Sequence, residues 1–512
     1  MRLPPAELVG AIPVSVTVPQ RGRVVDSAHA TSTARLARNV AALASGQLVT
    51  WTLTAIWTVF VPNRLGARGM GELGVAMALA NVLGTAVGLG IGPLMIKEIA
   101  RDHSRAAGLV GSALFLRLLS VPIAVAVIPI YLLLTHAGPE LTVVIWLSIG
   151  GALISMVATP LVFGLQGLER MQYGAYSDVL TKAAVACGGV TLVLFGFGIV
   201  PLMWLSLALA MLAAILSWRW TWSHFRIDWR PNLSRIQFLA TNSLPYWATG
   251  LVLTFYMWID LLMLDRMTPI EVVGWYNVPT RLFATLLVVP TILSTVLLPR
   301  LARAFREGSR AFTAQARPAL EVTLILSLPI AIGGALVSKQ AIWVLYGYKF
   351  LPAIPVLSVL ALCVPATYLN TMANQVLIAA NRQVVWTKTM IVAAIANPLI
   401  NLVLIQVTQT RWHNGALGAA LALLATELGM SVAAIVLMPR ILTVSSWLRI
   451  LRAAVATAGM GLAVWLVSFH SGLFVQVGTG LVTFMALAAL LRIVTDAEMT
   501  ELRRLPRMFR GT

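Results

Sequence analysis

The sequence contains few charged residues and almost no cysteine. Of its 512 residues, 11% are charged and 59% are hydrophobic, whereas soluble domains have about 25% charged and about 45–50% apolar residues. A soluble chain of this length has no place to bury so much apolar side chain, so the composition excludes a series of soluble domains. Cys187 and Cys363 both lie in apolar runs, which excludes a disulfide framework and a thiolate metal cluster. The sequence therefore predicts a polytopic membrane protein.

Motifs for nucleotides, nucleic acids and catalysis are also missing. The glycines of Gly88–Gly92 lie in an apolar run with no preceding strand, so close helix packing explains them better than nucleotide binding. The net charge of +19 comes from cations in short segments between apolar runs, not from the basic face that binds nucleic acid. No loop is long enough for a catalytic domain, and no histidine lies mid-run. We expect no enzyme, no metal site and no resident cofactor; a coupling proton or sodium ion stays open.

Long apolar runs fill most of the chain. A helix crosses the hydrocarbon with about 20 mostly apolar residues, and these runs are too long for the alternating strands of a membrane barrel. We therefore predict an all-α protein with fourteen transmembrane helices. Their expected ranges are 39–62, 70–96, 106–134, 141–165, 171–197, 199–218, 237–260, 272–298, 318–346, 352–378, 383–407, 414–438, 448–469 and 472–493.

The distribution of lysine and arginine fixes the expected orientation. With the N-terminus inside, 28 of the 37 cations fall in cytoplasmic segments or toward the cytoplasmic ends of spans, six in external segments or toward external span ends, and three deep inside spans, as the positive-inside rule requires. Both termini are therefore expected in the cytoplasm. Residues 1–38 read as a disordered tail, and the basic segment 494–512 is either a second tail bound to anionic lipid or a plain topology signal.

Short sequence matches indicate an internal repeat. Leu119–Ala124 recurs as Leu326–Ala331, Gly167–Arg170 parallels Ala379–Arg382, and two further matches keep the same order. Because six spans separate the copies, both copies enter the membrane in the same direction. We predict two six-helix bundles, 39–220 and 237–438, related by a pseudo-two-fold axis along the membrane normal, with the last two helices, 448–493, appended.

Several short motifs in the sequence resemble those of a known family. Arg64-Leu-Gly66 with Gly71-Glu72-Leu-Gly74, then Trp258–Leu264, Pro299–Arg303 and Gly415–Ala420, are similar in order to motifs of the polysaccharide exporter branch of the multidrug/oligosaccharidyl-lipid/polysaccharide superfamily. In the first motif, the spacing between Arg and Gly is one residue shorter than in the family. The resemblance implies that a lipid-linked oligosaccharide is flipped between leaflets, without saying which sugar.

Three cations lie inside predicted spans, where ionisable groups are costly and usually face a cavity or a partner. These cations are Arg117, Lys182 and Arg281. One interpretation is that they bind an anionic diphosphate headgroup in a water-filled cleft between the halves, because a guanidinium fork matches phosphate oxygens. The alternative is packing: Lys182 pairs with Asp178 four residues before it, and the two arginines bind backbone carbonyls.

The candidate coupling groups or charge partners are acids that also lie inside predicted spans. They are Asp178, Asp260 and Glu427; Asp260, like Glu321, is also close enough to a predicted span end to reach solvent. Polar amides accompany them, with cavity lining and interhelical hydrogen bonding as the two interpretations, and the pattern favours hydrogen bonding for those spaced one turn apart. These amides are Asn277, Asn370, Asn374, Asn397 and Asn401.

Three functions fit these features. The leading hypothesis is a flippase in the bacterial plasma membrane that moves a polyprenyl-diphosphate-linked glycan outward by alternating access, with membrane lipids, a polysaccharide polymerase and glycosyltransferases as partners. The second is a multidrug antiporter coupled to protons or sodium, although Arg117 and the absence of an acid in the first four apolar cores favour an anionic cargo. The third is a scaffold for cell-wall enzymes, which the short tails disfavour.

Overall fold

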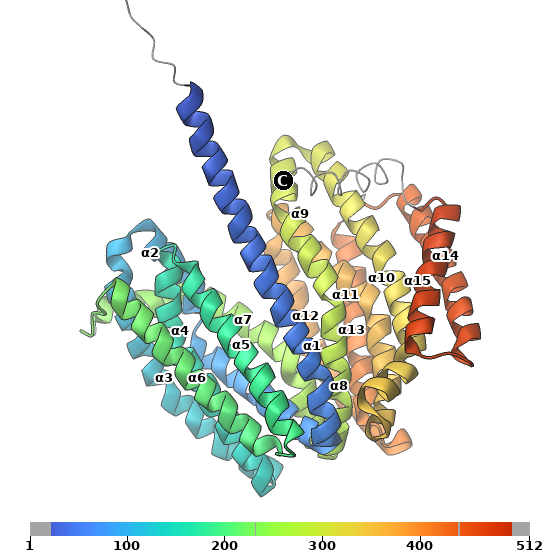
Figure 1. Ribbon diagram of the computed structural model, residues 1–512, viewed down its shortest axis with the longest axis horizontal. Coiled ribbons are helices and arrows are strands. Elements are labelled where there is room, and N and C mark those ends of the chain that lie inside the picture. The colour runs from blue at the N-terminus through green and yellow to red at the C-terminus, as the bar shows by residue number, and fades with distance from the viewer. Residues whose placement is uncertain (1–21, 231, 439–440, 494–512) are drawn as a thin grey trace, which may run out of the picture. The chain divides into compact units, whose positions relative to one another are not determined.

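The computed structural model describes residues 22–230, 232–438 and 441–493, and in this part of the chain all regular elements are helices (Figure 1). The α-helices are α1 (Gly22–Gly88), α2 (Ile91–Arg101), α3 (Ala106–Thr135), α4 (Pro139–Gly167), α5 (Met171–Leu194), α6 (Ile199–His224), α7 (Leu233–Met267), α8 (Ile270–Leu286), α9 (Val288–Glu307), α10 (Ser309–Tyr346), α11 (Ile354–Ala379), α12 (Gln383–Trp412), α13 (Gly415–Leu437), α14 (Val444–Ser468) and α15 (Leu473–Leu490). Two 3-10 helices lie at His103–Arg105 (η1) and Tyr348–Ala353 (η2). The predicted all-α class is confirmed.

Thirteen helical stretches among the described residues are long and apolar enough to cross a membrane, so the chain is a multi-pass membrane protein. Helix α1 is two helices joined at Gly66, whose backbone angles are not helical (φ 69, ψ −176). Our first two expected spans, 39–62 and 70–96, lie on the two sides of this glycine. Helix α1 begins at Gly22, so residues 22–38, which we expected in a disordered tail, are helical. Residues 1–21 and the basic segment 494–512 lie outside the described residues.

Contacts within the unit Leu53–Thr512 fall into two groups of helices. In the first group, α4 packs against α2, α3, α5 and α6; in the second, α11 packs against α8, α9, α10, α12 and α13. Helix α7 contacts α2 and α3 as well as α8, α12 and α13, while α14 and α15 pack against each other and against α10. The connection between the two groups runs between α6 and α7, where we expected the halves to divide.

Helix α8 crosses the second part of α1 at very short range. A Cβ added to Gly71 would collide with the Ile270 carbonyl oxygen, and one added to Gly274 would collide with the Ala67 carbonyl oxygen. Small residues allow membrane helices to approach this closely. At the same crossing, the Asn277 amide donates a hydrogen bond of 2.7 Å to the Met70 carbonyl oxygen. The crossing therefore holds the first half of α8 directly on α1.

The span that contains α8 and α9 is broken in the middle. Pro290 has no backbone N–H, so the carbonyl four residues earlier, that of Leu286, loses its helical donor. The Tyr368 hydroxyl of α11 donates a 2.6 Å hydrogen bond to this carbonyl oxygen. Because an unpaired carbonyl is costly where water is absent, Tyr368 stabilises the break between α8 and α9.

The segment that joins α6 to α7 is fastened to the start of α3. The Asp228 N–H donates to the Ala107 carbonyl oxygen at 3.2 Å, and the Asp228 carboxylate pairs with Arg235 at 3.0 Å. The Arg230 backbone N–H, followed by the Arg235 guanidinium, lowers the pKa of Asp228 below its usual range. The ionised carboxylate thus ties the connecting segment to the first turn of α7.

Candidate functional site

Arg281 is a cation in α8 that has no acidic partner among the described residues. Its guanidinium carbon lies 4.8 Å from the centre of the Trp57 ring, and its Nη2 donates to the Met77 sulfur at 3.3 Å. The Arg281 Nε and the Tyr346 hydroxyl are both buried without a hydrogen-bond partner. Buried donors left unpaired are uncommon and costly. Arg281 therefore presents unused donors and an uncompensated positive charge.

Arg117 has a different environment. Its side chain is 2% exposed; Nη1 donates to the Met156 carbonyl oxygen and, at 2.5 Å, to the Thr159 hydroxyl, and Nη2 donates to the Gly88 carbonyl oxygen at 3.0 Å. These acceptors belong to α1 and α4, so the guanidinium connects three helices. We expected Arg117 to face a cavity, but this arrangement favours the alternative interpretation, in which it binds backbone carbonyls and fixes packing.

Lys182 and Asp178 form an ion pair on α5, with 2.7 Å between Nζ and Oδ2. The Lys182 side chain is 50% exposed and the Asp178 side chain is 59% exposed. The one-turn spacing predicted this pair. Because each charge is compensated on its own helix, the pair offers an anionic ligand less net attraction than Arg281 does.

Asp260 belongs to a buried polar cluster that joins α7, α8 and α12. The Tyr276 hydroxyl donates to its Oδ2 at 2.6 Å, and the Asn401 amide donates to its Oδ1 at 2.7 Å and to the Asn397 oxygen at 2.9 Å. Asp260 is 4% exposed, so the expectation that it reaches solvent is wrong. The span continues to Met267, which places Asp260 two turns inside the helix rather than at its end. The Asn397 amide nitrogen and the Asn401 oxygen have no partner.

Glu427 belongs to a second buried cluster, formed by α7, α11 and α13. Its Oε1 accepts from the Tyr256 hydroxyl at 2.9 Å and its Oε2 from the Asn370 amide at 2.8 Å. The Ser431 hydroxyl donates to the Asn370 oxygen at 3.2 Å. Asn374, one turn from Asn370, is half-buried and has no hydrogen bond to another described residue. The Glu427 carboxylate is therefore fully hydrogen-bonded, unlike the amides around Asp260.

Two buried ionic or hydrogen-bonded pairs were not predicted from the sequence. Glu321, which we expected to reach solvent from a span end, is 7% exposed and pairs at 2.8 Å with Arg449 of α14. The Tyr131 hydroxyl of α3 donates to Asp265 of α7 at 2.5 Å. Neither pair has a signal in local spacing, because the partners are far apart in sequence. The acids alone, inside or next to apolar runs, were the available indication that partners existed.

Replacing Arg117 with Ala is expected to lower the free energy of unfolding by about 3 kcal/mol, because three acceptors lose a charged donor in a region without water. Thermal unfolding of the purified protein in detergent measures the loss. Lys388→Ala, which removes an exposed cation from α12, is the matched control and should leave the transition unchanged. Equal stability of Arg117→Ala and the wild type contradicts the packing role.

The sequence profile described as polysaccharide biosynthesis protein matches residues 36–305, more than half of the chain. The chain belongs to the polysaccharide biosynthesis protein family. No curated protein matches this family member.

Two solved membrane-transport proteins share the fold of this family member. The lipid II flippase MurJ, in an inward closed conformation, superposes with a TM-score of 0.69 at 10% identity, covering 88% of this chain and 98% of the flippase. An inward-facing multidrug resistance MATE family transporter of the MOP superfamily superposes with a TM-score of 0.60 at 16% identity, covering 78% of this chain and 95% of the transporter. The family match agrees with the predicted polysaccharide branch, and these two structures confirm the predicted all-helical fold.

Proposed function

We propose that this family member moves a lipid-linked oligosaccharide from the inner to the outer leaflet of the bacterial plasma membrane. The observation that carries the proposal is Arg281, an inward cation with unused donors and no carboxylate among the described residues. A diphosphate supplies the charge and the acceptor oxygens that this guanidinium lacks. The family's place in polysaccharide biosynthesis supports a glycan as the remainder of the cargo.

Transport follows from how the site is held. Arg281 lies between Trp57 and Met77, which belong to the two parts of α1, and on α8, which the glycine crossing fixes to the second part of α1. A rearrangement of α1 relative to the first helix group therefore moves the headgroup site with it. The lipid chain stays in the bilayer while the glycan passes through the polar cleft that we predicted between the halves. Glycosyltransferases and a polymerase are the expected partners, with both termini in the cytoplasm.

Coupling belongs to the buried acids in this proposal. Asp260 accepts hydrogen bonds only from neutral groups and has no cation beside it in the described part of the chain. A carboxylate buried in this way needs a proton or a metal cation to compensate its charge. The unpaired atoms of Asn397 and Asn401 lie in the same cluster, so we assign coupling to Asp260 and packing to Glu427.

A flipping assay tests the proposed function. Purified protein is placed in liposomes that contain polyprenyl-diphosphate N-acetylglucosamine with an NBD label on the sugar, and dithionite reduces only the label in the outer leaflet. The protein is expected to raise the reducible fraction from about one half toward completion, since cargo from the inner leaflet becomes accessible. NBD-phosphatidylcholine is the control lipid. No acceleration, or equal acceleration of both lipids, contradicts the proposal.

A further inference from the structure

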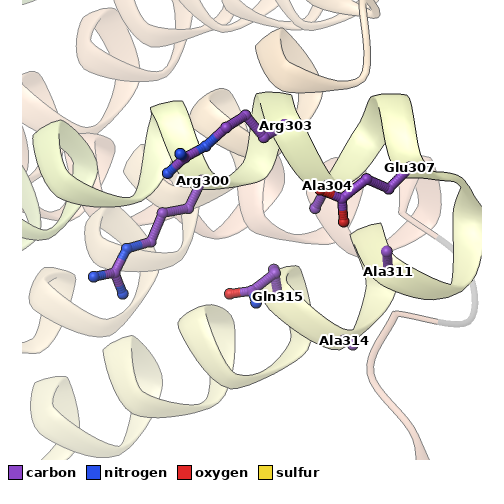
Figure 2. A pocket seen from close by; sticks show the side chains of 7 residues that line it. All are labelled: Arg300, Arg303, Ala304, Glu307, Ala311, Ala314 and Gln315. Atoms are coloured by element: carbon purple, nitrogen blue, oxygen red, sulfur yellow. The ribbon is translucent and has the colours of Figure 1, made fainter. Parts of the chain in front are cut away.

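The hairpin between α9 and α10 encloses a hollow of about 400 Å³ at the end of the broken span. Figure 2 shows Arg300 and Arg303 of α9 extending over one end of the hollow, with Glu307 nearer the hairpin turn and Gln315 on the facing helix α10. Alanine side chains of both helices form the rest of the lining. A volume of this size lies in the range of small-ligand sites.

The two arginines of this hollow are exposed and unpaired. Within the described ranges, neither Arg300 nor Arg303 forms an ion pair or a hydrogen bond. The short connection between α2 and α3 is different, because its cations are compensated: Arg101 pairs with Glu98, and Arg105 pairs with both Glu98 and Asp102. Arginines that only mark the cytoplasmic side do not need to converge on one hollow. Four arginines of the α9–α10 hairpin thus have no ion pair or hydrogen bond to a described residue, namely Arg300, Arg303, Arg306 and Arg310, and the first two of them line the hollow.

Along one face of α9, the exposed side chains change from apolar to basic to acidic toward the hollow. Val289, Ile292 and Val296 are exposed apolar residues, at 36%, 49% and 53%, and they are followed on the same face by the two arginines and then by Glu307. The steps of three and four residues keep all six on one side of a helix. From the membrane core toward the hairpin turn, the face therefore presents apolar side chains, then two cations, then a carboxylate, and the Gln315 amide lines the hollow from the facing helix α10.

We propose that this face of α9 is a loading site for a prenyl-diphosphate-linked glycan arriving from the inner leaflet. The prenyl chain lies along the exposed apolar residues, the diphosphate accepts hydrogen bonds from Arg300 and Arg303, and sugar hydroxyls donate to Glu307 and bond to the Gln315 amide. An ordinary anionic phospholipid can contact the apolar residues and the two arginines, but it has no sugar hydroxyls to donate to Glu307, whose carboxylate then lies near its phosphate. Arg281 lies 19 residues before Arg300, about 28 Å of helix at 1.5 Å per residue. The inference rests on the proposed function and adds a first, surface site to it.

The experiment compares two double variants of the full-length protein in neutral phosphatidylcholine nanodiscs. Arg300→Gln with Arg303→Gln removes both cations of the hollow; Arg306→Gln with Arg310→Gln removes the same charge from the same hairpin, outside the hollow. Native mass spectrometry measures binding of geranylgeranyl-diphosphate N-acetylglucosamine, with phosphatidylglycerol as competitor. All proteins also carry Arg281→Gln, so that binding at the deep site does not mask the surface site.

We expect the first double variant to bind the glycolipid at least 10-fold more weakly than the second, and phosphatidylglycerol to compete poorly. Equal loss in both double variants reduces the site to general charge, and equal competition by phosphatidylglycerol makes it a phospholipid site; either result overturns the inference. Failure of the proposed function is recognised separately. For this purpose Arg300→Gln with Arg303→Gln is also made with Arg281 intact. If that variant flips the labelled glycolipid at the wild-type rate, and the Arg281→Gln form of it binds the glycolipid normally, the loading site fails and the function stands.

Discussion

Replacing Arg281 with Gln is expected to reduce flipping of the labelled glycolipid about 100-fold. The Arg281 guanidinium, like that of Arg117, has no carboxylate beside it among the described residues, but unlike Arg117 it donates to no oxygen atom and its one donated hydrogen bond goes to the Met77 sulfur. Removing one member of a buried charge pair with phosphate costs about 2–5 kcal/mol, and each 1.4 kcal/mol is about tenfold in affinity. Initial rates in the dithionite assay, at equal amounts of reconstituted protein, measure the effect.

A conservative variant separates charge from geometry at this position. Arg281→Lys keeps the positive charge but not the planar fork, so we expect it to recover part of the rate and to remain about 10-fold below the wild type. Folding is checked by thermal unfolding, which Arg281→Gln should leave unchanged or raise, because it removes an unpaired buried cation. A rate equal to the wild type in Arg281→Gln, with the protein inserted normally, contradicts headgroup binding by this residue.

Arg281 and Arg117 have different hydrogen-bond partners, and this difference could not be predicted from the sequence. Both are single arginines in apolar runs without a local acid, so the same role was predicted for both. Their difference is made by other helices: α4 and the end of α1 offer oxygen acceptors to Arg117, whereas α1 offers an aromatic ring and a thioether to Arg281. Acceptors on other segments are set by packing, and neither hydropathy nor residue spacing records packing.

Features that depend on local periodicity were predictable. The apolar runs gave the helices to within a few residues for most spans, and the one-turn spacing gave the Lys182–Asp178 ion pair. Helix ends that project beyond the apolar run were not predictable from hydropathy: α9 continues to Glu307 and α10 begins at Ser309, beyond the expected ends at 298 and 318. The hollow with Arg300 and Arg303 lies in these extensions. From the sequence, these arginines were therefore interpreted only as cations that set the orientation of the chain in the membrane.

Two buried carboxylates compete for the coupling role, and their surroundings distinguish them. Both oxygens of Glu427 accept hydrogen bonds, and the amide that donates to it is itself paired through Ser431. Around Asp260, by contrast, an amide oxygen and an amide nitrogen remain without partners. Oxygen atoms without donors are suitable ligands for a hard cation, and a carboxylate in such a cluster binds either that cation or a proton. The structure around Asp260 thus contains an amide oxygen and an amide nitrogen without partners, whereas the unpaired atom beside Glu427 in the described part of the chain is the Thr367 hydroxyl.

Asp260→Asn is therefore expected to abolish gradient-driven accumulation while leaving equilibration between the leaflets intact. Asn keeps the size of the side chain but cannot change its charge, so neither a proton nor a sodium ion biases the transport cycle. Liposomes with an imposed pH or sodium gradient measure the labelled glycolipid held in one leaflet beyond one half. We expect the wild type to exceed one half under one of the gradients, Asp260→Asn to stay at one half, and Glu427→Gln, the matched acid-to-amide control, to behave like the wild type. Two results contradict the coupling role of Asp260. If Asp260→Asn still accumulates the glycolipid, its carboxylate is not needed for coupling. If Glu427→Gln loses accumulation to the same extent, the effect is not specific to Asp260.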